Sequence, residues 1–320
     1  MRFMNSFNKF AGKWMPVIIL VCLCFGITFA ESIGKLTFLV PSLFAFMTFT
    51  GTLDSSFRQL LNIAKHPLPL VVSLLIVHLA VPLLALGLGK LFFSGTPYFI
   101  AGTVLEFVVP SAVASLLWSS IAGGNSSLTL TIVLVDTLAA PFMVPFSLRL
   151  LVGANVSVDV WGMMRDLIWM IAVPALATML LNQFTKGRAG KKLAPVLAPY
   201  GKIALILIIT INSTRIAPFI RHMTPLLFGV TAVIFALAVF GYAAGWFAGA
   251  VLKQPADITS SMTFGSGMRN ISAGAVIAAA YFPAEVMFPV MIGTTFQQVL
   301  ASIFARLLTR KKGSSTKKKG

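Results

Sequence analysis

Residues 258–282 read ITSSMTFGSGMRNISAGAVIAAAYF, an apolar stretch with a polar, glycine-rich centre. Its length suits a helix that crosses a hydrocarbon core of about 30 Å at about 1.5 Å per residue. Its middle nevertheless holds Gly265-Ser266-Gly267, followed by Arg269 and Asn270. Glycine weakens a helix, and an arginine at membrane depth is costly. The stretch therefore predicts a membrane helix that is broken at its centre and carries a charge there.

The composition of the whole chain indicates a polytopic membrane protein. Of 320 residues, 58% are hydrophobic and 10% are charged, and the mean hydropathy is +0.92. Soluble domains carry about 25% charged residues, so this chain could not cover a water-facing surface of its size. The two cysteines and three histidines form no disulfide or zinc pattern, and no catalytic motif is present. We expect neither an enzyme, nor a cofactor, nor a metal site.

Ten apolar stretches can be read along the chain. They cover residues 15–30, 36–52, 68–92, 97–121, 126–152, 160–182, 197–219, 224–250, 258–282 and 285–308. The first resembles a signal peptide, but nine more follow, so we expect it to stay as an uncleaved helix.

The net charge of +17 reports orientation rather than a nucleic-acid partner. With the N-terminus in the cytoplasm, 18 of the 25 lysines and arginines lie in inside segments and six lie outside. The remaining one, Arg269, belongs to neither group and falls at the middle of a span. This bias predicts a multi-pass protein of the inner (plasma) membrane, with both termini cytoplasmic.

The spans divide into two similar halves, residues 1–152 and 153–309, followed by a basic cytoplasmic tail at 310–320. Each half holds five spans, which is an odd number, so the two halves would enter the membrane from opposite sides and form an inverted repeat. The fourth span of each half is interrupted, by Pro110-Ser111 and by Gly265-Ser266-Gly267. Matching interruptions are a sequence indicator of a transport site. The alternative is that proline and glycine merely kink both helices.

Four ionisable residues stand out inside the spans: His78, Glu106, Asp136 and Arg269. Arg269 needs an anion from the protein or from a ligand, and we expect an Asp136–Arg269 pair across the two halves. The alternative is that each faces a watery vestibule alone. Glu106 either carries a proton or bonds to unwound backbone. His78 is interpreted as a neutral packing residue.

Four short stretches carry motifs of a known transporter family. Residues 46–53, FMTFTGTL, are similar to its M-F-x-M-G-L-x-L stretch, and Lys65-His66-Pro67 matches a loop triplet. Residues 110–141 follow its fourth and fifth helices without gaps, and Gly267-Met268-Arg269-Asn270 is similar to its E-x-G-M-Q-N segment. On these motifs the chain resembles the bile acid:sodium symporter family, within the bile/arsenite/riboflavin transporter superfamily, as a bacterial member.

The resemblance implies a fold of ten transmembrane helices in two inverted five-helix repeats. Helices 1, 2, 6 and 7 would form a panel domain, and helices 3–5 and 8–10 a core domain. Helices 4 and 9 would be unwound and would cross at the substrate site.

The same resemblance implies that the two sodium sites of the family are degenerate here. The matching positions are Val77, Ser115, Leu116, Thr129, Val133, Gly265 and Arg269. Only Ser115 and Thr129 offer a side-chain oxygen, and a guanidinium repels cations. We expect Arg269 to take the electrostatic role of an ion.

The sequence thus predicts a monomeric secondary transporter of a small organic anion, bile-acid-like or a carboxylate or sulfonate, working by alternating access. The expected substrate contacts are Ser111, Ser115, Thr129, Arg269, Asn270 and Gln298. Transport would be sodium-independent, by uniport or by proton coupling through Asp136 and secondly Glu106.

Three alternatives were weighed against this interpretation. A symporter could keep sodium dependence through backbone carbonyls and the remaining hydroxyls. An arsenite-type exporter would need a thiol in the fourth helix, which has none. A sensor without transport activity would need a soluble domain, and the loops are short.

Overall fold

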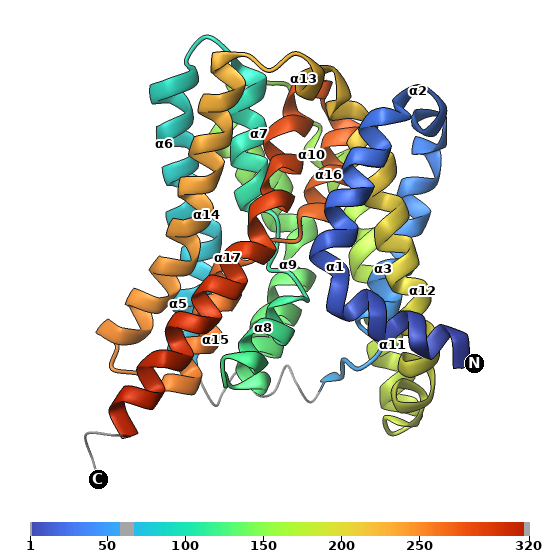
Figure 1. The fold of residues 1–320 in the computed structure, drawn as a ribbon, viewed down its shortest axis with the longest axis vertical. Coiled ribbons are helices and arrows are strands. Elements are labelled where there is room, and N and C mark those ends of the chain that lie inside the picture. The colour runs from blue at the N-terminus through green and yellow to red at the C-terminus, as the bar shows by residue number, and fades with distance from the viewer. Residues whose placement is uncertain (1, 58–66, 317–320) are drawn as a thin grey trace.

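The computed structural model describes residues 2–57 and 67–316, and this part of the chain is helical throughout (Figure 1). The helices are α1 (Arg2–Thr28), α2 (Ala30–Ile33), α3 (Val40–Gly51), α5 (Pro67–Leu75), α6 (Val81–Phe93), α7 (Pro97–Val108), α8 (Ser115–Ile121), α9 (Ser126–Val152), α10 (Val160–Leu167), α11 (Val173–Phe184), α12 (Arg188–Ser213), α13 (Ala217–Arg221), α14 (Pro225–Val251), α15 (Ala256–Gly267), α16 (Ile271–Tyr281) and α17 (Ala284–Thr316). Arg58, Lys65, His66 and the tail end at 317–320 lie outside the described residues.

The lengths of the helices confirm an all-α membrane protein. Within residues 2–57 and 67–316, seven are long and apolar enough to cross a membrane: Ala30–Gly51, Pro67–Phe93, Ser126–Val152, Val160–Phe184, Arg188–Arg221, Pro225–Val251 and Ala284–Thr309. Three shorter apolar helices are Trp14–Thr28, Pro97–Val108 and Ile271–Tyr281. The predicted count of ten spans, the boundary at residue 152 and the inverted repeat stay predictions.

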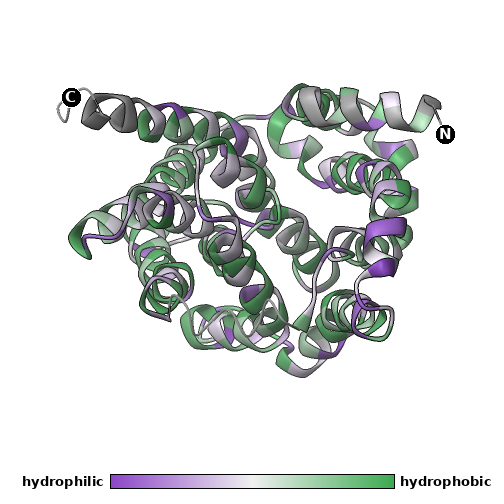
Figure 2. Cartoon of the chain, turned by 90° about the horizontal axis from the view of Figure 1, so that it is seen from below, coloured by the Kyte–Doolittle hydropathy of each residue, from purple (hydrophilic) through white to green (hydrophobic). Residues whose placement is uncertain are grey.

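The surface of the bundle is apolar, as a lipid-facing surface must be. Large side chains such as Leu91, Trp161 and Phe247 are 70%, 72% and 71% exposed. Viewed from below, hydrophobic residues run around the periphery of the helices, with hydrophilic ones at few positions (Figure 2).

The helices form two groups (Figure 1). In one, α12 packs against α1 and α3, and α11 packs against α3. In the other, α7 packs against α6, α9 and α17, and α14 packs against α15 and α17. The groups meet where α16 packs against α3 and α12. The Tyr281 hydroxyl at the end of α16 donates to Asp166 Oδ2 of α10 at 2.5 Å.

Two spans contain a wide π-helical turn, η3 (Ile76–Ala80) and η4 (Ile168–Ala172). Each turn is followed by a Val-Pro pair, which ends in Pro82 or Pro174. Proline donates no backbone hydrogen bond, and its ring clashes with the carbonyl four residues back, so the helix widens before it. His78 therefore lies on a widened turn.

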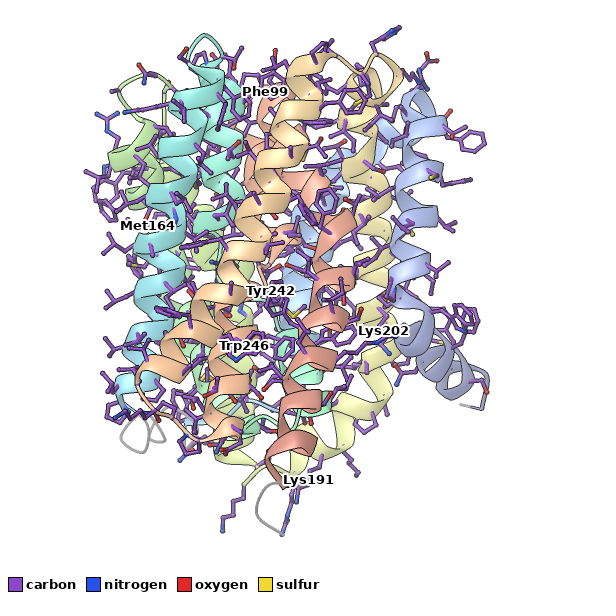
Figure 3. The ribbon with its side chains drawn as sticks, turned by 60° about the vertical axis from the view of Figure 1, so that its left-hand side comes forward. Phe99, Met164, Lys191, Lys202, Tyr242 and Trp246 are labelled. Carbon is purple, nitrogen blue, oxygen red and sulfur yellow. The ribbon has the colours of Figure 1, made fainter. Side chains whose placement is uncertain are left out.

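A stripe of three glycines on α14, Gly241, Gly245 and Gly249, receives the backbone of α15. A Cβ on Gly245 would lie 2.5 Å from Met262 O and 2.9 Å from Thr263 Cα. Such small-residue stripes let membrane helices approach closely. Tyr242 and Trp246 of α14 point toward α17 (Figure 3), where the Tyr242 ring stacks on Phe304 with centroids 4.9 Å apart.

The stripe predicts a stability difference between two alanine variants of α14. Gly245→Ala must push α15 away, so we expect the free energy of unfolding to fall by about 1–3 kcal/mol. Gly229→Ala is the control, because its Cβ would lie at an ordinary 3.5 Å from Phe93 Cε1. That variant should change stability by at most about 0.5 kcal/mol. Thermal unfolding of the purified protein in detergent measures both, and equal melting temperatures would contradict the packing.

Candidate functional site

The two interrupted spans meet through their backbones. Residues 109–114 separate α7 from α8, and residues 268–270 separate α15 from α16. Ser111 and Arg269 form an isolated antiparallel bridge between these segments. Two more backbone hydrogen bonds flank it, Ala112 N to Met268 O at 3.1 Å and Asn270 N to Pro110 O at 2.7 Å. Each break therefore supplies partners that the other break needs.

Asp136 of α9 holds this crossing in place. Its Oδ2 accepts from both the backbone N–H and the hydroxyl of Ser111, each at 2.7 Å. Its Oδ1 lies 2.6 Å from Nε2 of His78 on η3. The Ser111 hydroxyl also lies 2.8 Å from the carbonyl oxygen of Gly265. One fully buried carboxylate thus joins α9, η3 and the first broken segment.

Arg269 is buried at 2% exposure, directly beside this network. Its backbone N–H donates to Gln297 Oε1 of α17 at 2.7 Å. Its three guanidinium nitrogens have no hydrogen-bond partner in the structure. Asp136, Glu106 and Tyr242 lie within electrostatic range of it. An uncompensated buried guanidinium is a strong site for an anion.

The predicted direct Asp136–Arg269 ion pair is not formed. The carboxylate oxygens of Asp136 are taken by other groups. The backbone N–H and the hydroxyl of Ser111 both donate to Oδ2, and His78 Nε2 lies beside Oδ1. The interpretation of His78 as a packing residue is corrected, because its ring is the hydrogen-bond partner of Asp136.

Glu106 lies near the end of α7 and is 3% exposed. Its Oε2 has no hydrogen-bond partner. A Cβ on Gly293 of α17 would lie 2.1 Å from its Oε1, so a glycine is required opposite the carboxyl group. Glu106 is therefore a buried carboxyl group within the field of Arg269 but outside the Asp136 network.

The other predicted contacts have partners of their own or lie apart. Thr129 Oγ1 bonds to Ser119 Oγ at 2.8 Å and to Asn125 O at 3.1 Å. Asn270 caps α16 through Ala273 N, and Gln298 accepts from Trp118 Nε1 at 2.8 Å. Ser115 Oγ is buried without a partner. Gln297, the neighbour of the predicted Gln298, is the glutamine that reaches Arg269.

The positions that the resemblance assigns to sodium are poor in oxygen. Val77, Leu116, Val133 and Gly265 have no side-chain oxygen. The Thr129 hydroxyl is hydrogen-bonded to Ser119 Oγ and to the Asn125 carbonyl, and the Gly265 carbonyl accepts from the Ser111 hydroxyl. Among the described residues no group of three or more His, Cys, Asp or Glu side chains could hold a metal ion.

Comparison of the sequence with known proteins identifies its family. A model of the sodium bile acid symporter family matches residues 40–223. The YbaS protein of Bacillus subtilis (strain 168) is 40% identical over 296 residues, which are 92% of this chain and 97% of that protein. The chain belongs to the sodium bile acid symporter family. The resemblance inferred from the motifs is confirmed, and the protein is a membrane transporter, not an enzyme.

Other relatives in the symporter family are more distant. The probable sodium/metabolite cotransporter BASS1 of the Oryza sativa subsp. japonica chloroplast is 27% identical over 264 residues, which are 81% of this chain and 62% of that protein. The sodium-dependent transporter YocS of Bacillus subtilis (strain 168) is 20% identical over 312 residues, which are 97% of this chain and 95% of that protein.

The site predicts different losses of stability when two fully buried serines of this symporter-family protein are replaced by alanine. Ser111→Ala removes a donor from the buried Asp136 carboxylate, so we expect a loss of about 1–3 kcal/mol in stability. Ser115→Ala removes a hydroxyl without a partner and should stay within about 0.5 kcal/mol of wild type. Thermal unfolding compares them, and a Ser115 variant that is the less stable of the two would contradict the assignment.

Proposed function

We propose that the protein is a secondary active transporter that carries a small organic anion by alternating access, without sodium. The observation that carries the proposal is Arg269, a permanent cation buried at the backbone crossing with three unpartnered nitrogens. A guanidinium presents a planar fork of donors that matches a carboxylate or a sulfonate. The substrate class is thus a bile-acid-like molecule or a smaller carboxylate or sulfonate.

Alternating access needs two bodies that move against each other around a fixed site. The proposed bodies are a panel of helices 1, 2, 6 and 7 and a core of helices 3–5 and 8–10. The two helix groups of Figure 1 support this division. Counting each broken span as one gives ten spans in two inverted repeats, in a monomer with both termini in the cytoplasm.

Around Arg269, the proposed substrate contacts are Ser111, Ser115, Thr129, Asn270 and Gln298. Ser115 supports this best, because its buried hydroxyl has no protein partner. Asp136, Glu106 and Arg269 together set the charge of the site, and the coupling is to protons or is absent.

The role of Arg269 can be tested in proteoliposomes with radiolabelled taurocholate and pyruvate as probes. Arg269→Gln keeps a polar side chain but removes the charge, so we expect uptake of the transported probe to fall at least about tenfold. Arg269→Lys should retain part of the activity, because the charge stays and the fork is lost. Arg306→Gln, at an exposed position of α17, is the control. Unchanged uptake in Arg269→Gln refutes the proposal.

Ion replacement separates the two coupling schemes. We expect uptake to stay within about twofold when potassium or choline replaces sodium, because sodium needs oxygen ligands and five of the seven positions have no side-chain oxygen. The alternative function is a sodium-dependent organic anion symporter that uses atypical ligands, namely backbone carbonyls, Ser115 and Thr129. Loss of uptake on sodium removal would favour that alternative.

A further inference from the structure

The hydrogen bonds of Ser111 leave one acceptor more than the hydroxyl can serve. A serine hydroxyl has a single proton to donate. Two acceptors lie within reach of Ser111 Oγ: Asp136 Oδ2 at 2.7 Å and the Gly265 carbonyl at 2.8 Å. With Asp136 ionised, the hydroxyl serves one acceptor, and the other oxygen faces it without a proton between them. A proton on Oδ2 resolves this, because the acid can donate to Oγ while the hydroxyl donates to Gly265.

The other side of the carboxyl group directs the proton to Asp136 rather than to His78. His78 Nε2 lies 2.6 Å from Oδ1, and we assign the proton of this bond to Nε2, so that the ring donates to the carboxyl group. Nδ1 is buried and has no partner. A second ring proton would be a buried donor with no acceptor, which is costly. His78 is thus a positioning residue. A proton on Asp136 Oδ2, by contrast, has an acceptor in Ser111 Oγ, 2.7 Å away.

We propose that Asp136 binds an exchangeable proton at Oδ2 and that this proton is the coupling ion of the transporter. The inference rests on the proposed transport function and names the ion of that same site. In the protonated state, Asp136 Oδ2–H donates to Ser111 Oγ, whose own proton goes to Gly265 O. These two consecutive hydrogen bonds connect the first broken span to the second. Release of the proton returns the Ser111 hydroxyl to the carboxylate and frees the Gly265 carbonyl.

The charged groups around the pair give the coupling its sign. Arg269, between α15 and α16, lies within electrostatic range of Asp136, of Glu106 on α7 and of Tyr242 on α14. Other titratable groups on the packed helices are Lys90 on α6, Tyr98 on α7, Arg149 on α9, Arg165 and Asp166 on α10, Asp257 on α15 and Glu285 on α17. Glu106 Oε2 is buried without a hydrogen-bond partner, so this carboxyl group is neutral, and the Asp136 carboxylate balances the Arg269 guanidinium. An entering anion adds one negative charge, and one proton per monovalent anion offsets it, so the proton and the anion travel in the same direction.

The first experiment detects the proton without any substrate. Infrared difference spectra of the full-length protein in lipid nanodiscs, taken while the pH is raised, should lose the C=O stretching band of a buried carboxylic acid. Asp136→Asn should lack this band. Glu106→Gln, the matched buried carboxyl control, should keep it, and so should His78→Gln. Ser111→Ala should shift its frequency and Ser115→Ala should not, which keeps the test valid if Asp136→Asn fails to fold. A band that survives in Asp136→Asn or vanishes in Glu106→Gln overturns the proposal.

The second experiment measures coupling in proteoliposomes loaded with the pH dye pyranine. Addition of the transported probe, pyruvate or taurocholate, should acidify the lumen with wild type. Asp136→Asn mimics the protonated acid, so it should exchange labelled for unlabelled probe without acidification. Wild-type uptake without acidification overturns the coupling while leaving the transport function standing. Failure of wild type to move either probe counts against the transport function, and the infrared band then decides the proton site by itself.

Discussion

The Asp136 carboxylate is the group on which the polar centre of the protein depends. Two helices break inside an apolar bundle, and each break exposes backbone groups that no lipid could satisfy. The backbone bridge between Ser111 and Arg269 satisfies part of this need. Asp136 completes it by taking the N–H of Ser111, and His78 steadies the carboxylate from the opposite side. Each broken span therefore needs the other for its backbone hydrogen bonds. Both are stabilised by the Asp136 carboxylate, which belongs to a third helix, α9.

The sequence predicted what is decided locally. The interruption predicted at Pro110-Ser111 falls within residues 109–114, which separate α7 from α8. The glycines at 265 and 267 belong to α15, and the residues outside the helices follow them, at 268–270. The span read at 126–152 coincides with α9 (Ser126–Val152). The cost of a buried arginine is also local, and it marked Arg269.

The partners of these residues could not be read from the sequence, because they depend on helix rotation. The π-helical turn before Pro82 sets the direction of His78, which a regular helix would have placed elsewhere. Gln297 and Gln298 are consecutive residues, so their side chains differ in direction by about 100° around the helix. This difference in direction decides that Gln297 accepts from the Arg269 backbone N–H. The glycine stripe of α14 also went unrecognised, although its four-residue spacing is visible in the chain; α14 in turn connects α15 to α17.

The bond between Tyr281 and Asp166 has a consequence for the proposed movement of the helices. It joins α16, which begins at the crossing, to α10 of the same half of the chain. In the transport scheme proposed above, α10 belongs to the panel and α16 to the core, so this hydrogen bond connects the two bodies. A movement of one body against the other would have to break it.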